Sequence, residues 1–158
     1  MSGFVFTARD AVHKRIIECI DKKNALPFEI NNAIIYYAGA TPEPPHLAIG
    51  SCGPTTSGRM DVYTPTLLDM GLAGMIGKGV RNGEVISAIK RNRAVYLCAI
   101  GGAGALACRC VKSCEEIAFP DLGCESVKKL EIVDFPLIAA IDCSGGNLFR
   151  PAILKKSY

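Results

Sequence analysis

Residues 53–78 read GPTTSGRMDVYTPTLLDMGLAGMIGK, and the interpretation of the whole chain starts from this stretch. The apolar residues 47–49 followed by Gly53 and Pro54 predict a strand that ends in a sharp turn. Hydroxyl side chains and Arg59 follow closely, a combination that suits a carboxylate or a phosphate, because a guanidinium holds either group through two parallel hydrogen bonds. The alternative is a strand–turn–helix corner whose Thr and Ser side chains only cap a helix.

Length and composition narrow the classes of protein that need to be considered. The chain has 158 residues, which predicts a single domain over residues 1–158 with a real hydrophobic core. A net charge of +3, with lysines and arginines scattered along the chain, gives no basis for nucleic-acid binding. No apolar run reaches membrane-spanning length, and Met1 is not followed by a signal sequence. We therefore expect a cytoplasmic protein without membrane contact.

Four of the eight cysteines lie close together in the sequence: Cys108, Cys110, Cys114 and Cys124. Their spacing, C-x-C-x3-C-x9-C, lacks the paired C-x2-C units of zinc sites and matches no common iron–sulfur run. A helix expected at 103–111 would also point the first two thiols about 200° apart. We therefore expect no metal site on this chain, and no disulfide in a reducing compartment.

Strand and helix patterns alternate in the first two thirds of the chain, and strands dominate the last third. Helices are expected at 8–20, capped by Thr7, within 61–69 with Pro65 near its first turn, at 82–89 and at 103–111. Strands are expected at 4–6, 33–37, 46–50, 74–78, 94–100, 116–119, 129–133 and 136–141, and residues 148–154 are expected to form a final short strand or a tail. This order predicts an α/β fold with a mixed central sheet. His13 is expected to pack rather than to bind a ligand, because no second His or carboxylate pairs with it in the sequence.

Several of these segments together resemble one family. The segments TARDAVHKR (7–15) and GPTTSGRMD (53–61), and the lysine of MIGKG (75–79), resemble the β subunit, or C-terminal half, of the iron–sulfur hydro-lyases. This family comprises the class I fumarases and the L-tartrate dehydratases. The segment FPLIAAIDCSGGNLF (135–149) is similar to the end of the same domain. The resemblance implies a swivelling β/β/α domain.

The resemblance also implies roles for four residues. Arg9 and Arg59 would each grip one substrate carboxylate, Lys78 would add a third cation, and Thr55 would act as a catalytic base. Three cations and a hydroxyl at strand ends suit a C4 dicarboxylate.

The activity implied by the resemblance is the reversible hydration of fumarate to (S)-malate in the tricarboxylic acid cycle. The chain would be the β subunit of an α2β2 enzyme, inactive without its α subunit, whose cysteines would hold the 4Fe–4S cluster. Two alternatives stay open: an L-tartrate dehydratase β subunit, and a non-catalytic anion-binding or assembly module.

Overall fold

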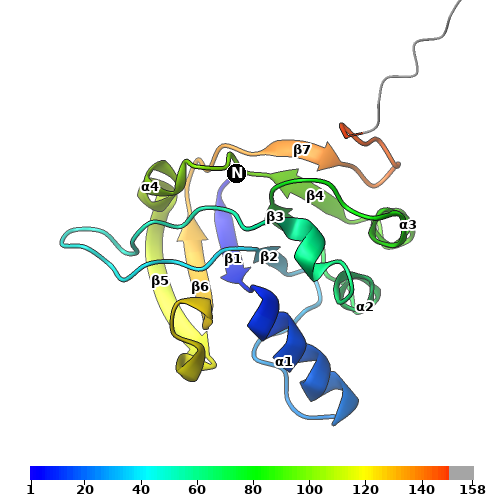
Figure 1. Cartoon of the computed structure of the whole chain (residues 1–158), viewed down its shortest axis with the longest axis horizontal. Helices are drawn as coiled ribbons and strands as arrows, with labels where there is room; N and C mark the ends of the chain where they lie inside the picture. The colour runs from blue at the N-terminus through cyan, green and yellow to red at the C-terminus, as the bar shows by residue number, and fades with distance from the viewer. Residues whose placement is uncertain (150–158) are drawn as a thin grey trace, which may run out of the picture.

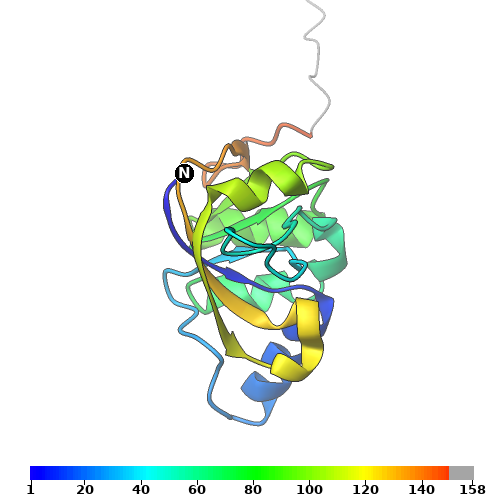
Figure 2. The ribbon, with the colours of Figure 1, turned by 90° about the vertical axis from the view of Figure 1, so that its left-hand side faces the viewer.

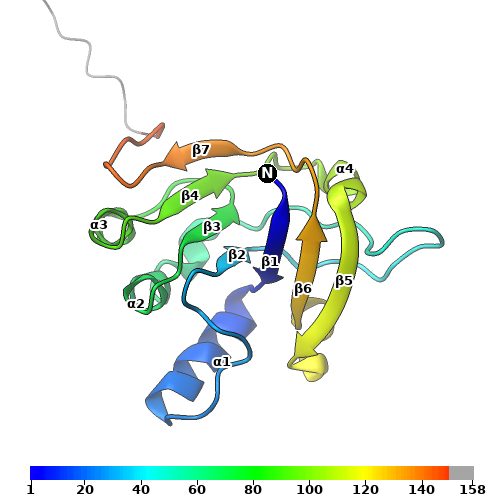
Figure 3. The same cartoon turned by 180° about the vertical axis from the view of Figure 1, so that it is seen from behind.

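A computed structural model describes residues 1–149 of the chain. The fold is organised around a mixed sheet. The described part contains seven strands in the order β5-β6-β1-β2-β3-β4-β7 (Figures 1 and 3). Their bounds are β1 Gly3–Thr7, β2 Ile34–Tyr36, β3 Gly74–Gly77, β4 Val95–Cys98, β5 Val111–Ala118, β6 Val127–Ile132 and β7 Ile138–Ile141. Strands β1 to β4 pair in parallel and the others antiparallel, which confirms the α/β class and is consistent with the swivelling β/β/α domain.

Two hydrophobic cores lie on opposite faces of this sheet. The helical elements are α1 Asp10–Asp21, η1 Ser57–Met60, α2 Thr64–Asp69, α3 Gly83–Arg91, α4 Gly104–Ala107, η2 Cys108–Cys110 and η3 Pro120–Glu125. Buried residues of α1, α2 and α3 pack with Ile35 and Met75, whereas α4, η2 and the segment 38–52 pack with Tyr36 and Ile76. Because neighbouring residues of a strand point to opposite faces, each short strand serves both cores. Figure 2 views the β5 side, with α4 and η3 near opposite ends of that strand.

The sequence predicted the start of α3 correctly. The Asn82 side chain accepts a hydrogen bond of 2.9 Å from the Val85 N–H and thereby satisfies one of the free donors of the first turn. Glu84 in the first turn and Lys90 and Arg91 in the last turn complement the helix dipole. Pro65 lies at the start of α2, also as predicted.

Several predicted elements are wrong. Residues 46–50 form no strand, and the segment 39–53 instead projects from the sheet as a long loop (Figure 1, cyan). Prolines at 42, 44 and 45 precede the expected strand and leave the first half of the loop with few N–H donors for pairing. Thr7 does not cap α1, because its Oγ1 accepts a bond from the Lys128 N–H and donates to the Ser126 carbonyl.

The C-terminal third of the chain also departs from the prediction. The helix expected at 103–111 stops at Cys110, and the strand expected at 116–119 begins already at Val111, because pairing with β6 overrides the local helical pattern. Of the short strand or tail expected at 148–154, residues 148 and 149 are not in a strand, and residues 150–154 lie outside the described residues.

None of the helices in residues 1–149 combines the length and the apolar character needed to cross a lipid bilayer.

Candidate functional site

The candidate site lies where the parallel strands end. Arg9 follows β1 by two positions and Lys78 directly follows β3. The loop that carries Thr55 is held between β2 and β3: its Thr55 N–H donates to the Tyr37 carbonyl at 2.6 Å, and Thr56 pairs with Lys78 as an isolated parallel bridge. The carboxyl ends of parallel strands meet at one edge of a sheet, which is where α/β proteins place their ligands.

Ser57 fastens this loop to the end of β3. Its N–H donates to the Lys78 carbonyl at 2.9 Å, and its Oγ accepts from the Lys78 N–H at 3.0 Å. A third contact, of 2.9 Å, joins Ser57 Oγ to the Tyr96 hydroxyl. The approach requires glycine at position 77, since a Cβ there would lie 2.0 Å from Ser57 Oγ. The backbone of Lys78 is therefore fixed by the loop itself.

The polar ends of Lys78 and Thr55 remain available to a ligand. The Lys78 side chain runs beside Gly101, where a Cβ would lie 3.4 Å from Lys78 Cδ and 3.7 Å from Nζ. Within residues 1–149, Lys78 Nζ forms no ion pair and Thr55 Oγ1 makes no hydrogen bond. Both residues are half-buried, so a ligand could reach an ammonium and a hydroxyl at this edge.

Arg59 is tied to the first turn of α1. Its Nε and Nη2 donate to the two carboxylate oxygens of Asp10 at 2.8 and 2.7 Å. This bidentate pairing leaves the Nη1 edge of Arg59 without a partner in the described part of the chain, and the side chain is 52% exposed. Because Asp10 follows Arg9 directly, the pairing brings both predicted carboxylate-binding arginines to the start of one helix.

Arg9 lies at the N-terminus of α1, where a cation opposes the helix dipole. The carboxylate of Glu125 compensates for this charge: one oxygen lies 3.4 Å from Arg9 Nη2, and the other accepts from the Ala11 N–H at 3.4 Å. The Arg9 side chain crosses Gly39, where a Cβ would lie 3.0 Å from its Nη1. Its Nε is buried without a hydrogen-bond partner among residues 1–149, and 23% of the side chain is exposed.

His13 packs as the sequence predicted and supports the backbone of Arg9. It is fully buried, its ring lies 5.2 Å from the Tyr37 ring centroid, and its Nδ1 is 2.9 Å from the Arg9 carbonyl, to which it donates. Burial, with a smaller contribution from the Arg81 charge, lowers the pKa of His13 to about 4, although the bond to the Arg9 carbonyl acts in the opposite direction. The imidazole is therefore neutral at physiological pH.

We expect the stability of the chain to fall as the pH falls from about 6.5 towards 4. The folded state keeps His13 neutral, whereas the unfolded state takes up a proton below pH 6.5. The free energy of unfolding therefore falls by up to roughly 3 kcal/mol over this window. Denaturant unfolding at several pH values measures this loss. In His13→Gln the slope over this window should be flatter, whereas His46→Gln in the exposed loop should keep it. An unchanged slope in His13→Gln contradicts the assignment.

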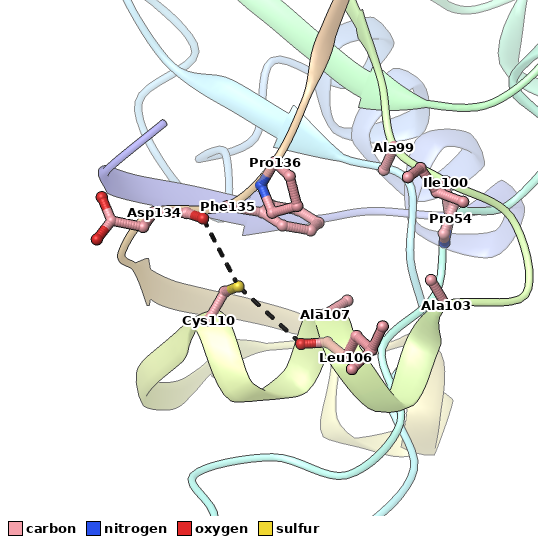
Figure 4. Close-up of a pocket in the computed structure, with 10 residues that line it drawn as sticks. All are labelled: Pro54, Ala99, Ile100, Ala103, Leu106, Ala107, Cys110, Asp134, Phe135 and Pro136. Atoms are coloured by element: carbon pink, nitrogen blue, oxygen red, sulfur yellow. Dashed lines mark hydrogen bonds between the residues drawn. The ribbon is translucent and has the colours of Figure 1, made fainter.

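An apolar cavity of about 350 Å³ opens beside the loop (Figure 4). It is lined by Pro54, Ala99, Ile100, Ala103, Leu106, Ala107, Cys110, Asp134, Phe135 and Pro136. The Cys110 Sγ lies against the Leu106 and Asp134 carbonyls in Figure 4. Arg9, Arg59 and Lys78 are not among the lining residues, so the cavity is not the anion site.

The thiols of the described residues do not suit an iron–sulfur cluster. Within residues 1–149, no three His, Cys, Asp or Glu side chains come together as a metal site. Burial raises the pKa of Cys52 to about 12 and also raises the pKa of Cys114.

The sequence analysis missed four charged residues around the site. Asp10 and Glu125 pair with Arg59 and Arg9, and Asp61 forms a buried ion pair with Arg81. Only Asp10 gave a local signal, as an acid in the first turn of a helix. The other three depend on contacts between residues distant in the sequence.

Comparisons with known proteins place the chain in a family. The sequence profile of the family described as Fumarase C-terminus matches residues 1–152. The aerobic class I fumarate hydratase of Escherichia coli (strain K12) is 39% identical over 152 residues, which cover 95% of this chain and 28% of that protein. Fumarate hydratase 2 of Leishmania major is 37% identical over 155 residues, covering 97% of this chain and 27% of that protein.

A third relative is close to this chain in length. A Methanocaldococcus jannaschii protein with the provisional name L(+)-tartrate dehydratase subunit beta is 37% identical over 164 residues, covering 100% of this chain and 84% of that protein. The chain thus spans less than a third of the two fumarate hydratases, but most of the archaeal protein. The resemblance seen in the sequence is confirmed: the chain belongs to the fumarase C-terminus family, whose members include class I fumarate hydratases and a protein named as a tartrate dehydratase beta subunit.

Proposed function

We propose that this chain is the β subunit of a two-subunit iron–sulfur hydro-lyase that reversibly hydrates fumarate to (S)-malate. The observation that carries the proposal is the fastening of one loop to the edge of the sheet. Through it Thr55 and Lys78 lie at neighbouring strand ends, and Arg59 bonds to the residue that follows Arg9. Three cations and one hydroxyl at such an edge suit a C4 dicarboxylate.

The proposed roles follow from the chemistry of each group. Arg59 offers its Nη1 edge, and Arg9 the exposed part of its side chain, to the two substrate carboxylates. Removal of the malate C3 proton places negative charge on the adjacent carboxylate, and fixed cations stabilise such charge where it develops. Thr55 is proposed to take part in that proton transfer, with Lys78 as the cation beside it.

The remaining parts of the enzyme are proposed to come from a partner. The described thiols do not fit a 4Fe–4S cluster, and the matched fumarate hydratases are more than three times as long as the segment they share with this chain. We propose that an α subunit holds the cluster in an α2β2 assembly, since the name of the M. jannaschii relative, a subunit beta, implies an alpha partner. A cytoplasmic location and a place in the tricarboxylic acid cycle belong to the same proposal.

A tartrate dehydratase β subunit is the second candidate function. The relative that favours it is the M. jannaschii protein, because this chain spans 84% of its length. Tartrate is also a C4 dicarboxylate, so the same cations would serve both substrates. Activity of one reconstituted enzyme on fumarate and on L-tartrate decides between the two.

We expect the purified chain alone to show neither iron–sulfur absorbance nor hydratase activity, because it is proposed to contribute substrate-binding cations and its residues 1–149 hold no set of cluster ligands. Both properties should appear after anaerobic reconstitution with an α subunit that carries the cysteines. The measurements are the visible absorbance of the cluster and the absorbance of fumarate. Full activity of the chain by itself would contradict the subunit assignment, and an inactive reconstituted complex on both substrates would favour the non-catalytic module.

A further inference from the structure

A buried ion pair lies behind the loop of the candidate site. Arg81 Nε donates to Asp61 Oδ1 at 2.6 Å, and the two side chains are 0% and 8% exposed. A buried ion pair adds little net stability, because removing two charges from water offsets much of their attraction. Stability alone therefore does not account for this pair.

The remaining contacts of Arg81 hold its guanidinium in one orientation. Nη2 donates to Thr64 Oγ1 at 2.8 Å. The guanidinium carbon lies 5.4 Å from the Tyr37 ring centroid and 5.0 Å from that of Tyr96, so the cation is in contact with two aromatic rings. A planar guanidinium can make edge and face contacts together, which a lysine ammonium cannot reproduce.

The two tyrosines that contact Arg81 also contact the candidate site. The Tyr37 carbonyl accepts the Thr55 N–H at 2.6 Å. The Tyr96 hydroxyl lies 2.9 Å from Ser57 Oγ, which in turn accepts the Lys78 N–H. One buried cation is therefore in contact with the rings of two tyrosines: the main chain of Tyr37 bonds to Thr55, and the side chain of Tyr96 reaches Lys78 through Ser57.

Asp61 holds the other end of the same loop. It follows η1, two positions after Arg59, and its second oxygen accepts from the Asn82 N–H at 2.7 Å. Asn82 in turn caps α3. The ion pair thus joins the end of the loop that carries Arg59 to the start of α3.

We propose that Arg81, together with Asp61, is a positioning residue of the dicarboxylate site. The pair does not touch substrate; it keeps Thr55, Lys78 and the Arg59 end of the loop in one arrangement. The inference rests on the proposed function for its consequence in catalysis, but the ordering of the loop is testable without activity.

The first experiment uses the double variant Arg81→Met/Asp61→Asn in the chain alone. The double change leaves no unpaired buried charge, and the asparagine retains an oxygen for the Asn82 N–H, so the variant should fold. Amide hydrogen exchange followed by NMR should show the Thr55, Ser57 and Lys78 amides exchanging at least about tenfold faster, with the core amides of α1 unchanged. Unchanged exchange at these three amides overturns the proposal.

A second variant keeps the test decisive if the double variant does not fold. Arg81→Lys keeps a cation beside Asp61 but loses the edge and face contacts of the guanidinium, so the Thr55, Ser57 and Lys78 amides should exchange faster, and unchanged exchange overturns the proposal. The matched control is Arg91→Gln/Asp69→Asn, which removes an exposed bidentate pair of 2.8 and 2.7 Å far from the loop. The control variant should change neither the exchange rates of the Thr55, Ser57 and Lys78 amides nor kcat/KM.

The second experiment measures kinetics after reconstitution with an α subunit. The double variant should lower kcat/KM on the order of 10- to 100-fold, because small misplacements of substrate-binding groups have effects of this size. Faster exchange with unchanged kcat/KM overturns the positioning role. If the unsubstituted complex has no hydratase activity, the proposed function fails, and the exchange result alone still decides whether the pair orders the loop.

Discussion

Arg59→Lys should lower kcat/KM of the reconstituted enzyme by roughly 2–4 kcal/mol of transition-state binding, the effect of one lost preorganised donor. Lysine keeps the positive charge but cannot bond Asp10 through two donors and still present a third edge to substrate. The melting temperature should barely move, since Arg59 is 52% exposed and an exposed ion pair contributes about 0–1 kcal/mol. Steady-state kinetics and thermal unfolding of the same preparation measure both effects.

The chain offers a matched control for this change. Arg91 makes a bidentate pair with Asp69 at 2.8 and 2.7 Å, and both side chains are about half exposed, which closely reproduces the geometry of the Arg59–Asp10 pair. Arg91→Lys should leave both kinetics and stability unchanged. If Arg59 has only a structural role, Arg59→Lys should behave like Arg91→Lys, and a normal kcat/KM would remove Arg59 from the site.

The sequence predicted much of the fold because several elements have strong local signals. The apolar runs of β1 to β4 and the Asn82 cap of α3 are readable within a few residues of chain. Errors occurred where a distant partner decides the structure. Thr7 had the right side chain for a helix cap, yet it bonds to Ser126 and Lys128, more than 100 positions away.

The candidate site was predictable only in part for the same reason. The segment with Thr55 and Arg59 stood out because hydroxyls and a guanidinium follow an apolar run, whereas Arg9 and Lys78 were assigned to the site through the family resemblance. Their roles remain predictions. The carboxylates that pair with the two arginines did not stand out, since Asp10 and Arg59 are 49 positions apart. Arg81 was missed because it precedes a capping residue and looks like an ordinary charge at a helix start.

Thr55→Val should reduce kcat far more than it changes KM, by about 10²- to 10⁴-fold if Thr55 takes part in proton transfer. Valine keeps the shape of threonine and the Thr55 N–H bond to the Tyr37 carbonyl, so the loop should stay in place. A threonine hydroxyl is a weak base and needs a nearby cation, for which Lys78 at the neighbouring strand end is the candidate.

The isotope effect separates proton transfer from binding. With malate deuterated at C3, the kinetic isotope effect on kcat should rise in Thr55→Val, because the proton-transfer step becomes more strongly rate-limiting. Thr56→Val is the control: Thr56 is the exposed neighbour in the same loop, and its change should leave kcat and the isotope effect as they are. If Thr55 only contacts bound substrate, KM should rise instead while the isotope effect stays constant. That result would assign the proton transfer to another group.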